Sequence, residues 1–205
     1  MGTIIQSPPT LKIPTGARPR TEHAEFGPPS TGIWVGLSAI TMTFAAFTSA
    51  MIVRHGSAPD WRHFSFPTIL YFNTGVLIAS SLTLQMARKR FRAFADGVLD
   101  QRPTLRALDA TLALGLLFVL GQYAAWLQLR SEGIYLATNP SSSFFYLFTV
   151  LHALHVIGGL LGLMYVILKL RRAVLAKATL DSASQYWHFM DVLWLYLLLL
   201  LWMRI

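Results

Sequence analysis

The chain has 205 residues, of which 54% are hydrophobic and only 13% are charged. A soluble domain usually carries about a quarter charged residues, so this composition excludes an ordinary water-soluble enzyme and a disordered chain. The lack of cysteine excludes disulfides, cysteine-ligated metal sites and thiol nucleophiles. In so apolar a chain, the net charge of +8 indicates basic residues gathered at one membrane face rather than nucleic-acid binding.

Residues 1–30 differ from the rest of the chain because they contain six prolines and few large apolar side chains. This composition predicts an extended, poorly ordered tail. No apolar core follows the first methionine, so we expect no cleavable signal peptide. The first spanning segment would then direct insertion into the membrane.

Five apolar segments each approach the roughly 20 residues that a helix needs to cross a hydrocarbon layer. They run approximately Ile33–Val53, Thr68–Ala87, Ala110–Leu129, Phe144–Leu168 and Tyr186–Met203. Each is apolar on all sides, which favours a membrane span over an amphipathic surface helix. We therefore predict that residues 31–205 form an all-α membrane protein, a bundle of five transmembrane helices.

The basic residues predict how this bundle sits in the membrane. Thirteen Lys and Arg fall on the side of the N-terminal tail and four fall on the other side. The positive-inside rule then places the N-terminus in the cytoplasm and the C-terminus in the periplasm. The basic run at 88–91 lies in the predicted inner loop 88–107 and is interpreted as a membrane-flanking anchor.

The fourth span carries two histidines at membrane depth, where polar groups are costly and usually have a role. His152 and His155 are three residues apart and project from one side of the helix, and Gly159 and Gly162 continue that stripe. Two interpretations stay open. The histidines could ligate a metal or haem, or, as we favour, they are neutral imidazoles hydrogen-bonded to neighbouring helices.

The fifth span repeats this spacing with His188 and Asp191. Catalysis by this pair is conceivable, but we favour a structural pair that ties the fifth span to the fourth, without direct contact between the two histidine sets. The sequence has no serine-hydrolase pattern, phosphate loop or dinucleotide fingerprint. These features predict a component of a larger assembly rather than a self-contained enzyme.

Four motifs, taken in order, resemble subunit III of the haem–copper terminal oxidases. Residues 144–160 contain His-x-x-His-Val-x-x-Gly, and residues 186–195 contain Trp-His-Phe-x-Asp-Val-x-Trp. Residues 70–84 resemble the family's Asn-Thr…Ser-Ser helix, and Gln122 with Trp126 matches part of its Gln-x-x-Glu-Trp. The resemblance covers about residues 30–205 and fits the five-helix bacterial form, which lacks two N-terminal helices of the mitochondrial form.

This resemblance implies a multi-pass subunit of the bacterial inner membrane that holds no cofactor or metal of its own. Haem and copper would lie in the oxygen-reducing, proton-pumping subunit I and in subunit II, and the chain would support them in aerobic respiration. It also implies bound phospholipid in a cleft between helices, and a respiratory supercomplex is a further expected setting. The motif positions assigned to helix contacts and the lipid cleft are Asn73, Gln122, Trp126, His152, His155, Gly159, Gly162, Trp187, His188 and Asp191.

Two positions depart from the family pattern, and three different functions stay open. Ile40 and Ala125 stand where many members carry glutamate, so roles linked to those carboxylates are not carried over. The chain could instead serve a quinol oxidase, since the electron donor is chosen elsewhere. It could also be a stand-alone haem-binding membrane cytochrome or a small transporter.

Overall fold

The computed structural model describes residues 28–57, 67–97, 100–136 and 138–204, so residues 1–27 of the predicted tail lie outside it. Within these ranges the chain is all-helical, with five helices and no strand. The helices are α1 (Pro28–Ser57), α2 (Ile69–Ala95), α3 (Arg102–Ser131), α4 (Pro140–Arg171) and α5 (Lys177–Arg204). All five are long and apolar enough to cross a membrane. The predicted fold class, a five-helix membrane bundle, is confirmed.

The helices extend beyond the predicted spans at most of their ends. α5 begins at Lys177, nine residues before the predicted start, and α2 and α3 take up most of the predicted inner loop. Apolar residues mark only the part of a helix that lies in hydrocarbon, whereas the backbone stays helical in the polar interface until a cap ends it. α4 shows such a cap, because the side chain of Asn139 accepts a hydrogen bond of 2.8 Å from the backbone N–H of Ser142.

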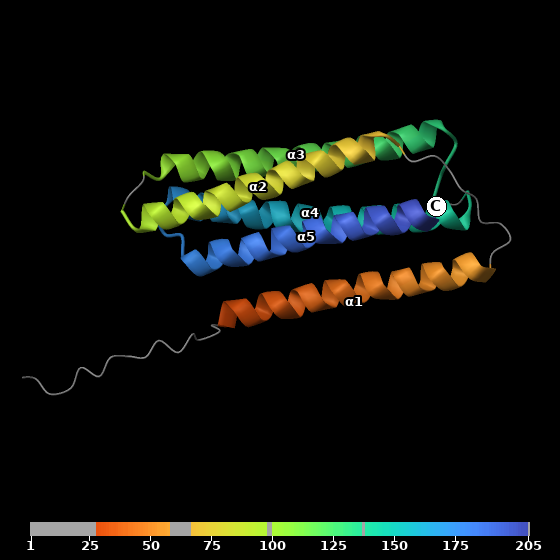
Figure 1. The fold of residues 1–205 in the computed structure, drawn as a ribbon, viewed down its shortest axis with the longest axis horizontal. Helices are drawn as coiled ribbons and strands as arrows, with labels where there is room; N and C mark the ends of the chain where they lie inside the picture. The colour runs from red at the N-terminus through yellow and green to blue at the C-terminus, as the bar shows by residue number, and fades with distance from the viewer. Residues whose placement is uncertain (1–27, 58–66, 98–99, 137, 205) are drawn as a thin grey trace, which may run out of the picture.

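The helices run up and down in an antiparallel bundle (Figure 1). α2 and α3 lie side by side along their length, and α4 and α5 form a second pair next to them. α1 flanks this group: among the described residues it contacts α4 and α5 but neither α2 nor α3. The bundle is therefore a four-helix core with one peripheral helix, and α5 is the helix that touches α1, α2 and α4.

Large aromatic side chains fill the centre of the four-helix core. Trp187 and Trp194 of α5, Phe118 of α3 and Phe148 of α4 are all 1% exposed or less. Gly115 of α3 makes room for them, because a Cβ added there would lie 2.7 Å from the Trp187 ring. The small residue thus leaves space on α3 for the Trp187 indole of α5, a common use of glycine where membrane helices pack.

Candidate functional site

The motif residues of α5 lie against α2, where indole N–H groups bind hydroxyls. Trp187 Nε1 donates to Ser80 Oγ at 3.0 Å, and Trp194 Nε1 donates to Thr74 Oγ1 at 3.0 Å. Ser80 donates its own proton to the carbonyl of Leu77 at 2.7 Å, so both the indole and the hydroxyl are satisfied. These bonds fix the register of α5 on α2 because an indole N–H left unpaired in a dry interior is costly.

Trp126 makes the corresponding contact between the other two core helices. Its Nε1 on α3 donates to Thr149 Oγ1 on α4 at 3.1 Å, and Thr149 bonds in turn to the carbonyl of Phe145. Three tryptophans therefore use the same chemistry to join helix pairs. Trp126 and Trp187 were among the predicted motif positions, whereas Trp194 was not, although it closes the same motif.

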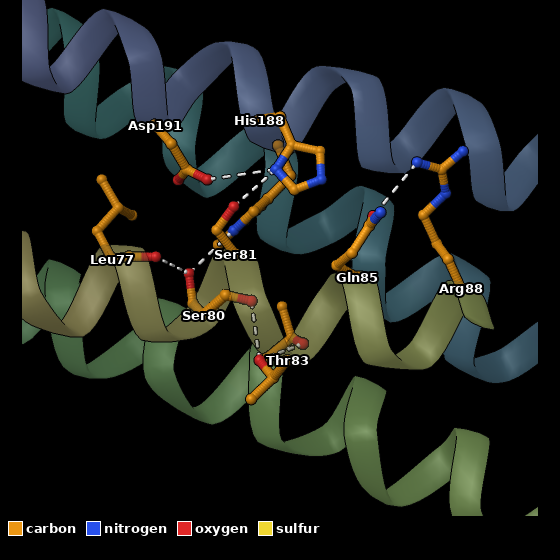
Figure 2. Close-up of polar contacts among 10 residues, drawn as sticks. Leu77, Ser80, Ser81, Thr83, Gln85, Arg88, His188 and Asp191 are labelled. Carbon is orange, nitrogen blue, oxygen red and sulfur yellow. Dashed lines mark hydrogen bonds and ion pairs between the residues drawn. The ribbon is translucent and has the colours of Figure 1, made fainter. Parts of the chain in front are cut away.

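His188 and Asp191 face Ser81 of α2 (Figure 2). His188 Nδ1 lies 2.7 Å from Ser81 Oγ and 3.7 Å from Asp191 Oδ2. Both groups approach the same ring nitrogen, whereas a Ser-His-Asp catalytic triad places the hydroxyl and the carboxylate on opposite nitrogens. The arrangement is suited to linking helices and not to activating the serine.

The hydrogen-bond partner of His188 differs from the prediction. We expected His188 and Asp191 to tie the fifth span to the fourth, but the hydrogen bond goes to α2. Neighbouring residues of α5 reach α4 instead: the Tyr186 hydroxyl donates to the carbonyl of His155 at 2.9 Å, and the rings of Trp194 and His152 lie 5.2 Å apart. Within the described part of the chain, no hydrogen bond joins the side chains of the two histidine pairs.

His152 and His155 occupy different surroundings although they share one side of α4. His152 is 1% exposed and sits between the Phe118 and Trp194 rings, and neither of its nitrogens has a hydrogen-bond partner among the described residues. His155 Nδ1 lies 2.7 Å from the carbonyl of Leu151 on its own helix, and its ring faces Phe44 of α1. The predicted hydrogen bonds from these histidine rings to neighbouring helices are therefore wrong; ring packing takes their place.

The two motif glycines, Gly159 and Gly162, also have different surroundings. A Cβ at Gly159 would lie 3.1 Å from the Tyr186 ring and 3.2 Å from the Trp187 ring, so Gly159 allows α4 and α5 to approach. Gly162 faces open space. Both line a cleft of about 380 Å³ between α4 and α5, with Ile33 of α1 and Tyr186 on its walls.

Asn73 of α2 lies at the α2–α3 contact, and Gln122 is a residue of α3. Both are fully buried, and neither amide has a hydrogen-bond partner among the described residues. Asn73 occupies the space left by Gly121, where an added Cβ would be 2.0 Å from Asn73 Oδ1. Gly121 and Gly115 were not among the predicted positions; the available signal was a glycine within an apolar span, which often marks close backbone approach.

The described residues contain no group of three or more His, Cys, Asp or Glu that could hold a metal ion. The motif side chains instead lie at helix contacts: α2 with α5, α3 with α4, α4 with α5 and α2 with α3. Chemically, this set of residues can fix helix positions and shape a small apolar cleft.

Comparison with known proteins gives one consistent family. The family description "Cytochrome c oxidase subunit III" matches residues 37–204. Over 176 residues the chain is 37% identical to "Probable cytochrome c oxidase subunit 3" of Mycobacterium leprae, and over 175 residues it is 33% identical to the protein of that name from Nocardia farcinica. It is 34% identical to "Cytochrome c oxidase subunit 3" of Corynebacterium diphtheriae.

Each of these three alignments covers 81% of this chain and 83% of the relative. The matched region runs through all five helices, so the similarity extends over the whole bundle. Together with the five apolar helices and the motif residues at their contacts, the match identifies the chain as a multi-pass membrane protein. The chain belongs to the cytochrome c oxidase subunit III family of haem–copper oxidase subunits.

Proposed function

We propose that this chain is the non-catalytic subunit III of a bacterial cytochrome c oxidase and lies in the plasma membrane. Membership of the family implies a complex with other oxidase subunits. In our proposal subunit I, with its haems and copper, reduces oxygen and pumps protons, and subunit II receives electrons from cytochrome c. The chain itself braces subunit I and adds no redox centre.

One observation carries this proposal: the tryptophans and His188 of the family motifs are hydrogen-bonded across helix contacts. Trp187, Trp194 and His188 all reach hydroxyls on α2. A redox or transport role would call for these groups to converge on a ligand or an aqueous path. Side chains that fix helix register instead support a rigid scaffold beside a catalytic neighbour.

The cleft lined by Gly159 and Gly162 supports the lipid part of the proposal. Its other walls come from Ile33, Tyr165 and Tyr186, so most of its surface is apolar or aromatic. A lipid chain fits such a surface, and Gly162, which faces open space, lets it approach the α4 backbone. We propose that this cleft between α1, α4 and α5 holds an acyl chain of a bound phospholipid.

The proposed orientation has a cytoplasmic N-terminus and a periplasmic C-terminus. It rests on the charge bias of thirteen to four. Lys169 and Arg171 in the last turn of α4 would then lie at the cytoplasmic face, whereas Arg130 in the last turn of α3 would lie at the periplasmic face.

The test is purification of the oxidase through an affinity tag on this chain, with identification of every co-purifying protein. The proposal predicts subunits I and II with haem and copper, and no Soret absorption from the chain once it is separated. A complex without the copper-bearing subunit II would favour a quinol oxidase. Haem retained by the isolated chain, or recovery without any oxidase subunit, would overturn the proposal.

A further inference from the structure

We propose that the face shared by α2 and α5 is the docking surface for one transmembrane helix of a partner oxidase subunit, and that this helix presents a hydrogen-bonding side chain to His188. The proposal rests on the proposed function, because it assumes that the chain is part of an oxidase complex. It adds which face is used and which chemistry the partner supplies.

The depth of His188 in the membrane is the first step. It lies eleven residues after Lys177 and sixteen before Arg204, the two ends of α5. At 1.5 Å per residue these are about 16 Å and 24 Å, and His188 lies two residues inside the predicted apolar span that begins at Tyr186. Its side chain is nevertheless 36% exposed on the surface of the bundle.

The second step is the free nitrogen of this exposed ring. Ser81 and Asp191 both approach Nδ1, and Figure 2 shows the other ring nitrogen on the side away from them. Nε2 has no partner among the described residues. If Nδ1 accepts the Ser81 proton, Nε2 carries a hydrogen and is a donor. If the neutral ring carries its proton on Nδ1, Nε2 is an acceptor. In a charged ring both nitrogens are donors. Lipid tails satisfy none of these states, so a polar group of another protein is required.

The shape of the surrounding surface indicates a helix as the occupant. From His188 towards the C-terminal end of α5, the exposed residues Val192, Leu195, Leu199 and Trp202 recur every three or four positions and form one stripe. The stripe ends in a groove of about 380 Å³ that Tyr71 of α2 also lines. Because α1 does not touch α2 among the described residues, this face of α5 is left uncovered between them (Figure 1).

The same face carries a second polar group. Gln85 of α2 lies one turn after Ser81 and is exposed, and only its carbonyl has a partner, Arg88 Nη1 at 3.5 Å. Its amide N–H groups have no acceptor among the described residues, near the predicted end of the second span. An apolar stripe with two hydrogen-bonding anchors matches a partner helix that is apolar apart from one or two polar residues.

The threonines on α1 do not make this demand. Thr41, Thr43 and Thr48 each donate to the carbonyl four residues earlier, at 2.8–2.9 Å. These hydroxyl protons are satisfied within their own helix, so α1 can face lipid there. An imidazole nitrogen and a glutamine amide on the α2–α5 face have no such internal partner.

The direct test is photocrosslinking in the intact complex, with p-benzoylphenylalanine placed at Val192 or, as a matched control, at Leu120. Both side chains are 65% exposed, and both lie near the middle of their helices, on α5 and α3 respectively. We expect Val192 to crosslink to another oxidase subunit and Leu120 to give no such product. A product from Leu120 alone, equal products from both sites, only lipid adducts at Val192, or a crosslink between two copies of this chain would overturn the proposal.

A second measurement separates docking from folding. His188→Leu should reduce the fraction of the chain retained in the purified complex by about fivefold or more, the effect expected for one hydrogen bond between membrane helices. His188→Gln, which places an amide near the position of Nε2, should restore most of the retention. Equal retention of all three proteins would contradict the proposal. If the tagged wild-type chain recovers no oxidase subunit at all, the proposed function itself fails.

Discussion

The four-helix core and the peripheral helix α1 are held by different interactions. In the core, Trp187 and Trp194 of α5 bind hydroxyls of α2, and Trp126 of α3 binds a hydroxyl of α4. α1 instead inserts apolar side chains such as Phe44 and Met51 against α4 and α5. The hydroxyls along α1 bond mostly to their own helix.

This difference indicates what each region can tolerate. Hydrogen bonds between buried groups fix one register, because any shift leaves a donor unpaired in a dry interior. Dispersion contacts between apolar side chains are less directional, so a helix held by them can shift with less penalty. We therefore expect substitutions in the core to lower the unfolding free energy strongly, and equivalent substitutions on α1 to lower it only weakly.

Gly115→Val should produce the largest effect. The new Cβ would lie 2.7 Å from both Trp187 and Leu160, and the buried Trp187 ring has little room to move. Overpacking of this kind should destabilise the chain by about 3 kcal/mol, measured by unfolding of the purified subunit in mixed micelles titrated with dodecyl sulfate. Gly36→Val on α1 is the matched control, because nothing lies within 4 Å of that position. Equal losses for the two variants would contradict the contrast between core and α1.

Trp187→Phe should produce the next largest effect. It removes the bond to Ser80 Oγ and part of a ring that is 1% exposed. We expect a loss of about 1–2 kcal/mol in the same unfolding titration, followed by circular dichroism because a tryptophan is removed. Trp202→Phe, at a position 63% exposed, should change the unfolding free energy by less than about 0.5 kcal/mol. A larger loss at Trp202 than at Trp187 would show that the buried bond is not what holds α5 to α2.

The sequence predicted the helices well because length and apolarity are local properties. Twenty apolar residues leave few alternatives to a membrane-spanning helix, whichever helices surround them. Motif spacing also placed His188 and Asp191 correctly on one side of α5. Asp191 Oδ2 lies 3.7 Å from His188 Nδ1, the same nitrogen that Ser81 approaches. These parts of the structure depend on residues close together in the chain.

The contacts between helices were harder to predict. Periodicity shows which side of α5 carries His188, but its partner Ser81 is 107 residues away and lies on α2 rather than α4. In the same way, nothing near His152 indicates that its ring would meet Phe118 and Trp194 instead of hydrogen-bonding groups. Gly121 became meaningful only when Asn73 was found in the space beside it. Each of these facts depends on how distant segments pack.

An ion pair at one end of the core gives a prediction of intermediate size. Arg88 of α2 donates through Nε and Nη2 to Asp181 Oδ1 of α5, at 3.0 Å and 2.5 Å, and both side chains are less than one-third exposed. A double-mutant cycle of Arg88→Gln and Asp181→Asn should give a coupling free energy of about 0.5–1 kcal/mol. The Arg171–Asp109 pair is longer, at 3.5 Å, and about half exposed, so its coupling should be close to zero. A larger coupling free energy for Arg171–Asp109 than for Arg88–Asp181 would show that side-chain exposure does not control the strength of these ion pairs.

The smallest effect is expected for the polar link between α5 and α1. Tyr196 donates from its hydroxyl to Thr48 Oγ1 at 2.9 Å, on the exposed surface of the bundle. Because Thr48 keeps its bond to the carbonyl of Phe44, removing the tyrosine hydroxyl leaves no donor unpaired. Tyr196→Phe should therefore change the unfolding free energy by about 0.5 kcal/mol or less. A loss as large as that of Trp187→Phe would mean that α1 is held by directed bonds in the same way as the core, and the distinction between the two regions would fail.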